Sequence, residues 1–217
     1  MRKRNLPSNA SVATEGEDGR LVAPAASRNS DVLCDLLVRW APTQGRALEI
    51  ASGTGQHVSA FAQRLPQLHW QPTEVDPERR ASINAYCRDL PNTTDAAALD
   101  ATSDGWHQHF AGQDLIVLIN LTHLISWRET QTLISEAALA LSPEGRFVLY
   151  GPFMRSGTLT SDGDQRFHDA LVQQDGEIGY KNDEDIAAEI CAQGLNVIGL
   201  IDMPANNLAF VAEKPQT

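Results

Sequence analysis

This 217-residue sequence lacks any apolar run long enough to cross a membrane. No window approaches the roughly 20 consecutive apolar residues of a bilayer-spanning helix, so we expect no membrane partner. The chain begins with Arg2, Lys3 and Arg4, but no apolar segment follows them, so they do not predict a secretory signal. These absences favour a cytoplasmic location.

Cysteine is scarce, which argues against both a disulfide framework and a metal centre. The three cysteines, Cys34, Cys87 and Cys191, are far apart and lack the spacing of metal ligands. We therefore expect them to be reduced and to pack as small hydrophobic residues. No bound metal is expected.

Basic residues are few: the chain has 17 Lys and Arg but 28 Asp and Glu, which gives a formal net charge of −11. Affinity for nucleic acids rests largely on cationic side chains at phosphates, so no nucleic-acid partner is expected. Nine of the carboxylates lie between residues 160 and 190, against Arg166 and Lys181 alone. This stretch indicates either a solvated helical face or the rim of a pocket that prefers a cationic substrate.

The chain length predicts one domain, because a typical domain has about 100 to 200 residues. Residues 1–20 are polar with little periodicity and should form a mobile arm, which leaves 21–217 as the domain itself. Within it, apolar runs alternate with segments of helical periodicity. We expect strands at 47–51, 68–73, 96–99, 115–119, 146–150, 195–201 and 208–212, and helices at 30–41, 55–64, from 77 onward, 127–141, 164–173 and 183–193.

This alternation predicts an α/β, Rossmann-like fold with helices on both faces of a mostly parallel, seven-stranded sheet. The last two strands are closely joined, so they should be antiparallel at one edge. The segment of about 154–180 is an insertion that should act as a lid. In such sheets ligands bind at the carboxyl ends of the strands.

A small-residue loop, Ala51-Ser52-Gly53-Thr54-Gly55, joins the first of these strands to a helix. Its glycines let the backbone turn sharply and let a ligand approach closely, although they would also suit an ordinary strand–turn–helix. A dinucleotide-binding loop would carry a third small residue where Val58 stands, and Glu49 would repel a phosphate. A sulfonium compound with an amino group fits this charge pattern better. The pattern from Glu49 to Gly55 resembles motif I of the class I S-adenosylmethionine (SAM)-dependent methyltransferases.

Carboxylates also follow the second and third predicted strands, 68–73 and 96–99. Glu74 ends the second strand, about 20 residues past the glycine loop, which suits an acceptor for the two ribose hydroxyls. Asp76 is placed to cap the helix that starts at Pro77. After the third strand, Asp100 could accept from the adenine amino group or could cap the next segment.

The central and fifth strands end in residues suited to the acceptor side of such a site. Asn120 and His123 follow the central strand, and His123 has a near-neutral reference pKa, so it is either a general base or a structural histidine. Asn120 either positions a ligand or pins the loop. After the fifth strand, Tyr150 and Phe153 are expected to form an aromatic wall.

Four motifs carry a more specific resemblance, to the family of uncharacterised class I methyltransferases that includes methyltransferase-like protein 26. It covers roughly residues 21–211, and its motifs are the stretches 48–57, 70–72, 149–153 and 203–208. The family generally shows A-E-R-N-K where this chain has Ala26-Ser27-Arg28-Asn29-Ser30, and the segment 167–172 also departs from its pattern. The resemblance therefore implies the fold and SAM as cofactor, but it does not carry over a substrate.

We therefore expect SAM-dependent methyl transfer to a small polar metabolite, at an oxygen, nitrogen or sulfur atom. The alternatives are a SAM-binding protein or SAM-dependent enzyme that transfers no methyl group and, as a weaker one, a nicotinamide-dependent oxidoreductase. A homodimer is one option for the oligomeric state. The expected cofactor residues are Glu49, Ala51, Ser52, Gly53, Gly55, Glu74, Val75, Asp100, Ala101 and Asn120; the expected substrate residues are Arg28, Asn29, Tyr150 and Phe153; and His123 and Asn120 are the expected catalytic pair.

Overall fold

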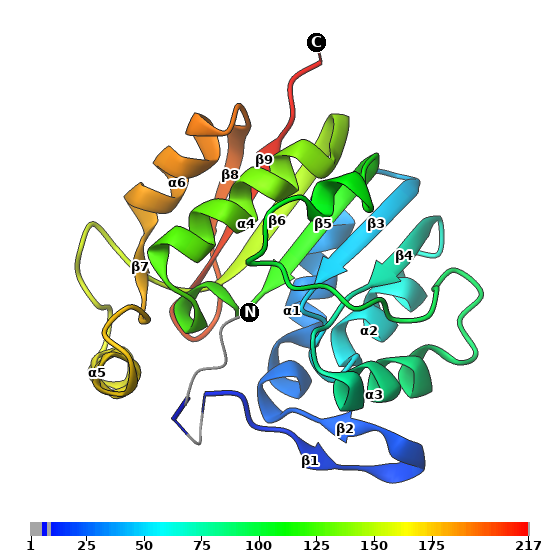
Figure 1. Cartoon of the computed structure of the whole chain (residues 1–217), viewed down its shortest axis with the longest axis horizontal. Coiled ribbons are helices and arrows are strands. Elements are labelled where there is room, and N and C mark those ends of the chain that lie inside the picture. The colour runs from blue at the N-terminus through cyan, green and yellow to red at the C-terminus, as the bar shows by residue number, and fades with distance from the viewer. Residues whose placement is uncertain (1–5, 8–9, 217) are drawn as a thin grey trace.

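The structure is a computed structural model that describes residues 6–7 and 10–216 of the chain. A seven-stranded sheet forms its centre, in the order β4-β3-β5-β6-β9-β8, with β7 paired to β6 (Figure 1). Neighbouring strands from β4 to β6 are parallel, whereas β9 is antiparallel to both β6 and β8. The strands are β3 (Gly45–Ile50), β4 (Leu68–Pro72), β5 (Gln113–Ile119), β6 (Leu141–Met154), β7 (Lys181–Asn182), β8 (Asn196–Asp202) and β9 (Asn207–Glu213). The predicted α/β fold with an antiparallel edge is confirmed.

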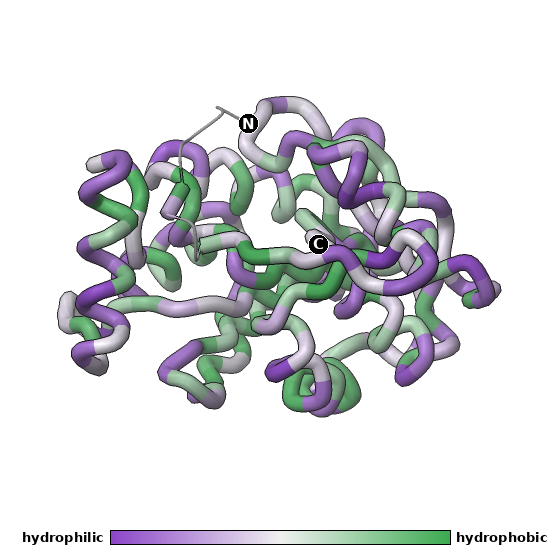
Figure 2. The backbone as a smooth tube through the Cα atoms, turned by 90° about the horizontal axis from the view of Figure 1, so that it is seen from below, coloured by the Kyte–Doolittle hydropathy of each residue, from purple (hydrophilic) through white to green (hydrophobic). Residues whose placement is uncertain are grey.

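Helices cover both faces of the sheet. Helices α1, α2 and α3 pack on one face and α4 and α6 on the other, and each layer encloses its own hydrophobic cluster. The bounds are α1 (Pro24–Trp40), α2 (Gln56–Arg64), α3 (Pro77–Cys87), α4 (Trp127–Ala140), α5 (Asp162–Gln174) and α6 (Asp183–Ala192). In Figure 2 the most hydrophobic segments gather at the sheet, and hydrophilic residues alternate along the outer helices. In the described part of the chain, no helix has both the length and the apolar character needed to cross a bilayer.

The predicted strand at 96–99 does not form as a continuous element. Only isolated parallel bridges, Trp70 to Thr93 and Thr73 to Ala97, join this segment to β4. The side chain of Asn92 instead donates to the carbonyl oxygens of Ala62 (3.0 Å) and Leu68 (3.0 Å), which anchors the segment as a loop. The seventh strand of the sheet is β7, which lies just after the expected lid.

Helix α1 begins earlier than the sequence indicated. Pro24 is its first residue, so Ser30, where the predicted helix began, lies inside it. The chain before it forms a two-stranded ribbon of β1 (Thr14–Glu15) and β2 (Leu21–Val22). The backbone N–H of Leu21 donates to Oγ of Ser82 on α3 at 2.8 Å, which joins this ribbon to the domain.

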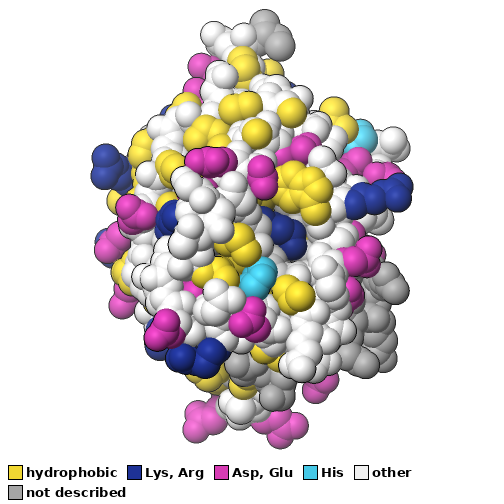
Figure 3. All heavy atoms as spheres, turned by 90° about the vertical axis from the view of Figure 1, so that its left-hand side faces the viewer, with side chains coloured by type: hydrophobic (Ala, Val, Ile, Leu, Met, Phe, Trp, Pro, Cys, Tyr) yellow, Lys and Arg dark blue, Asp and Glu magenta, His cyan; other side chains and the backbone are white. Residues whose placement is uncertain are grey.

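Helix α5 stands apart from the two helical layers, on the side of the molecule drawn in Figure 3. It packs through Leu171 into a small cluster with Leu124, Ile178 and Tyr180. On this side the acidic side chains are scattered among basic and hydrophobic ones (Figure 3). The side of the molecule that Figure 3 draws is therefore not a surface of one charge.

Candidate functional site

The glycine loop turns sharply between β3 and α2. Ala51, Gly53 and Gly55 all have positive φ angles, of 54°, 60° and 94°. A Cβ on Gly55 would lie 2.7 Å from Cα of Ile83, so this glycine allows α2 to start against α3. A Cβ on Gly53 would meet nothing closer than Nη1 of Arg79, at 3.6 Å. Gly55 is thus a packing residue, whereas Gly53 faces open space.

Glu74 fixes the loop to the end of β4. Its Oε2 accepts a 3.1 Å hydrogen bond from the backbone N–H of Gly53. Its Oε1 accepts from the backbone N–H groups of Val75 (2.8 Å) and Asp76 (3.2 Å). Asp76 itself caps α3, because its carboxylate accepts from the backbone N–H of Glu78 at 2.8 Å, as predicted. The two strand ends are therefore held in one rigid unit.

Glu49 is a buried acid beneath this loop, with only 1% of its surface exposed. Burial raises the pKa of its carboxyl to about 8, and the charge of Glu74 adds to the shift, although a hydrogen bond with Ser52 opposes it. Its Oε2 atom is buried without a hydrogen-bond partner among the described residues. A buried acceptor without a partner is costly, which makes this atom the natural contact for a cationic ligand group.

A first cavity of about 490 Å³ opens over the glycine loop. This volume is in the range of small-molecule sites. The cavity is bounded by the N-terminal segment, the start of α1, the glycine loop and the carboxyl ends of β4 and β5. Its lining includes Ser11, Ala25, Arg28, Glu49, Ala51, Ser52, Gly53, Glu74, Val75, Ala101 and Asn120.

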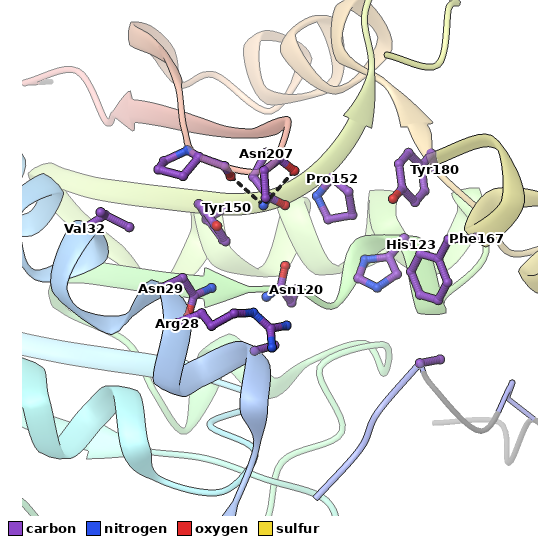
Figure 4. A pocket seen from close by; sticks show the side chains of 14 residues that line it. Arg28, Asn29, Val32, Asn120, His123, Tyr150, Pro152, Phe167, Tyr180 and Asn207 are labelled. Carbon is purple, nitrogen blue, oxygen red and sulfur yellow. Dashed lines mark hydrogen bonds between the residues drawn. The ribbon is translucent and has the colours of Figure 1, made fainter. Parts of the chain in front are cut away.

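A second cavity of about 480 Å³ adjoins the first (Figure 4). The two share Ala10, Ala25, Arg28 and Asn120 among their lining residues. The remaining wall is largely aromatic and amide in character. It includes Asn29, His123, Tyr150, Pro152, Phe167, Tyr180 and Asn207.

Asn29 lines the second cavity and links three elements. With its amide oriented so that both ends find partners, its nitrogen donates to the carbonyl oxygen of Ala25 (2.7 Å) and to Nε2 of His57 (2.8 Å). The Asn29 side chain is also hydrogen-bonded to Tyr150, whose pKa is raised overall by burial. Burial lowers the pKa of His57 to about 4, so this histidine is neutral.

His123 lies in η3 (Thr122–Leu124), directly after β5, and is buried. Burial lowers its pKa to about 3, and the charge of Lys181 adds to the shift. Its Nδ1 atom has no hydrogen-bond partner among the described residues. The ring packs edge-on against Phe167, with centroids 5.7 Å apart, and against Tyr180, at 6.2 Å. His123 is therefore an uncharged imidazole in an aromatic wall.

Asp164 holds α5 in its place over the second cavity. Its carboxylate accepts from the hydroxyl of Tyr180 (3.0 Å) and from the amide of Asn206 in the β8–β9 turn (2.9 Å). Burial alone would raise the pKa of Asp164, but these bonds and those from Thr160 and Ser161 lower it overall. One side chain thus connects α5 to both the sheet edge and the cavity wall.

A family model described as a protein of unknown function, DUF938, matches residues 20–214. The chain belongs to this family.

Several solved methyltransferases have the same fold as this DUF938 protein. An O-methyltransferase family protein from Burkholderia thailandensis aligns with a TM-score of 0.75 and 18% identity, over 88% of this chain and 57% of that one. Human N-acetylserotonin methyltransferase, solved in complex with SAM, aligns with a TM-score of 0.68 and 14% identity, over 88% and 54%. At such identities the likeness shows the fold, and this chain spans little more than half the length of either protein.

Most of the predicted site residues of the DUF938 protein do meet at the two cavities, but three do not. Phe153 lies in the core on the α4 face, edge-on to Phe210 with centroids 5.1 Å apart, because alternation along β6 turns it away from Tyr150. Asp100 accepts from the backbone and hydroxyl of Thr102, and its neighbours Leu99 and Ala101 line the cavity instead. Gly55, as described above, packs against α3.

The sequence analysis missed several lining residues. Arg79 comes from the first turns of α3, and Phe167 and Tyr180 come from the expected lid. Ser11 and Val12 belong to the segment expected to be a mobile arm. Only the aromatic character of Phe167 and Tyr180 could have marked them in advance.

Proposed function

We propose that this protein transfers a methyl group from SAM to a small molecule. The observation that carries the proposal is the unpartnered Oε2 of Glu49, buried below a glycine loop that opens onto a cavity of about 490 Å³. An acid there suits the amino group of SAM, because a bound ammonium group would stabilise its ionised form, whereas a pyrophosphate would not. The finer kinship to methyltransferase-like protein 26 rests on the sequence motifs.

The other cofactor residues have roles that their positions support. Glu74 is the acceptor for a ribose hydroxyl, since a carboxylate has about four lone-pair sites and backbone N–H groups use three of them, which leaves one. Val75 and Ala101 flank the base. The Asp100 role toward the adenine amino group is the weakest, because its carboxylate already accepts from Thr102.

The second cavity is the acceptor site in this proposal. When bound, SAM supplies an electrophilic methyl group, and transfer requires a nucleophile held in line with it. Asn120 lines both cavities, so it is suited to position the two partners. His123 is the base, its imidazole neutral and able to take a proton. Tyr150 and Asn29 complete the acceptor wall.

One observation weighs against His123 as the base. A pKa of about 3 makes His123 a weak base, whereas an efficient one has a pKa near the working pH. An acceptor that needs no proton removed would suit such a site. The nicotinamide alternative is disfavoured by Glu49 and by Val58 at the third glycine position.

Location, partners and segment roles belong to the same proposal. Free cysteines suit a reducing compartment, so we place the protein in the cytoplasm, as a monomer or homodimer. A net charge of −11 disfavours nucleic acid as the acceptor. The segment of about 154–180 and the described residues before Ser30 close over the cavities as a lid; residues 1–5 and 8–9 of the predicted arm lie outside the described part of the chain.

The test is a transfer assay with SAM labelled in its methyl group and a metabolite extract as the acceptor source. We expect label in a small molecule, with wild-type protein and not with Gly53→Val. Label in a protein or nucleic acid would remove the small-molecule proposal. SAM binding without any labelled product would favour the non-transferring alternative.

A further inference from the structure

The charged residues of the two cavities define which ligand group each can hold. We propose that Arg28 binds the carboxylate of SAM, so that the second cavity is left without a charged side chain and takes an uncharged, ring-containing acceptor. This inference rests on the proposed function and reassigns Arg28 from the acceptor to the cofactor.

The first cavity has two cations among its described lining residues, Arg28 and Arg79. Arg79 is engaged, because its Nη2 donates to the backbone oxygen (3.2 Å) and hydroxyl (2.7 Å) of Ser11. It also lies by Gly53, at the end of the cavity where Glu74 would take the ribose. Arg28 is the cation left for the carboxylate of SAM.

Arg28 is placed where the two cavities meet. It extends from α1 toward Asn120 in Figure 4 and lines both cavities. Among the described residues its guanidinium makes no hydrogen bond or ion pair of its own, unlike Arg79. A guanidinium pairs with a carboxylate through two parallel hydrogen bonds, which gives both strength and orientation. Together, Arg28 and Glu49 match the two opposite charges of an amino acid group.

With Arg28 engaged, no charged side chain remains among the described residues of the second cavity. His123 stays neutral, because burial lowers its pKa to about 3. An ionic acceptor would lose its hydration there without gaining a partner of opposite charge, which is unfavourable. The cavity therefore selects against both carboxylate and ammonium groups.

The shape and chemistry of the wall favour a ring. His123, Phe167 and Tyr180 pack edge-on to one another at centroid distances of 5.7, 6.2 and 6.1 Å, and Figure 4 shows them grouped beside Pro152. Aromatic side chains prefer such edge-on and offset contacts with another ring. Asn120 and Asn207 add amides that can recognise a hydroxyl or carbonyl group.

The Arg28 step is tested by titration calorimetry with two ligands, S-adenosylhomocysteine (SAH) and methylthioadenosine, which lacks the amino acid group. Arg28→Gln should weaken SAH binding by about 10- to 100-fold and leave methylthioadenosine binding unchanged. Arg39→Gln, on the same helix, is the control and should bind both as wild type does. Equal SAH affinity in wild type and Arg28→Gln would overturn this inference but not the proposed function. Failure of wild type to bind SAH would instead overturn the proposed function.

The acceptor step is tested by binding of three matched rings to the SAH complex: para-hydroxybenzamide, para-hydroxybenzoate and para-hydroxybenzylamine. The neutral amide should bind at least about tenfold more tightly than either ion, and Phe167→Ala should weaken it without changing SAH affinity. Preference for either ion, or no binding of any ring at millimolar concentration, would contradict the inference.

Discussion

Gly53 donates its backbone N–H to Oε2 of Glu74 at 3.1 Å, so the glycine loop after β3 and the end of β4 are one connected unit. The same carboxylate also accepts from Val75 and Asp76, at the start of the turn that leads into α3. A residue expected to bind ribose therefore also shapes the loop that is proposed to hold the cofactor. Loss of this carboxylate should affect both binding and stability.

Glu74→Ala should weaken SAH binding by about 10- to 100-fold, since it removes charge-assisted hydrogen bonds to the ribose and frees the loop. It should also lower the melting temperature, because three backbone N–H groups lose their acceptor. Glu78→Ala, in the exposed first turn of α3, is the control and should change neither quantity. Unchanged SAH affinity in Glu74→Ala would place the ribose elsewhere.

Glu49 should link ligand binding to proton release. Its pKa of about 8 in the folded protein means that the carboxyl is mostly protonated at pH 7, and a bound ammonium group would ionise it. Titration of SAH into the protein at pH 7, in buffers of different ionisation enthalpy, should show release of most of one proton. Glu49→Gln should bind SAH more weakly and release none. Equal release in both proteins would contradict this role.

The same pKa predicts how stability depends on pH. The folded-state pKa lies above 4.5, the ordinary value for a glutamate side chain, so the folded protein holds this proton more tightly than the unfolded chain does. The free energy of unfolding should therefore fall as pH rises from about 4.5 to about 8. Denaturant titrations should show a smaller fall over this range in Glu49→Gln.

His123→Ala should leave SAH affinity nearly unchanged and reduce turnover by roughly 10²–10⁴-fold, the usual contribution of a general base. The reduction should be smaller above the pKa of the acceptor, where no proton needs to be removed. His109→Ala, at an exposed position, should have wild-type turnover. If His123→Ala also has wild-type turnover at every pH, the histidine is a structural member of the aromatic wall.

The lid prediction concerns the residues before Ser30 and the segment 154–179. Asp164 connects α5 to Tyr180 and to Asn206, so this segment has a defined docked position. Hydrogen exchange in both segments should slow when SAH is added, and Asp164→Ala should speed exchange in α5. Equal exchange with and without SAH in both segments would contradict a closing lid.

Much of the fold could be predicted because its signals are local. The apolar run in β5, the Asp76 cap before Pro77 and the glycine loop each depend on a few neighbouring residues. Polar residues after the predicted strands then indicated that Glu74, Asn120 and His123 lie together at the carboxyl ends of the strands. This part of the site follows from topology alone.

The remaining features depend on contacts between distant segments. Helix α1 starts at Pro24, directly after Ala23. The backbone N–H of Ala23 donates to Oε1 of Gln56 on α2 at 2.7 Å, a partner that the local sequence does not reveal. Phe153 was misplaced because β6 continues beyond the predicted strand end, so alternation carries it into the core. Ser11 reaches the cavity through a hydrogen bond with Arg79 of α3.

The central claim is that the first cavity binds SAM, and calorimetric titration of the purified protein with SAM, SAH and NAD tests it most directly. The account predicts that SAM and SAH bind to wild type, that NAD does not, and that Gly53→Val binds none of them because its side chain would enter the cavity over the loop. Binding of NAD without binding of SAM or SAH would contradict the account.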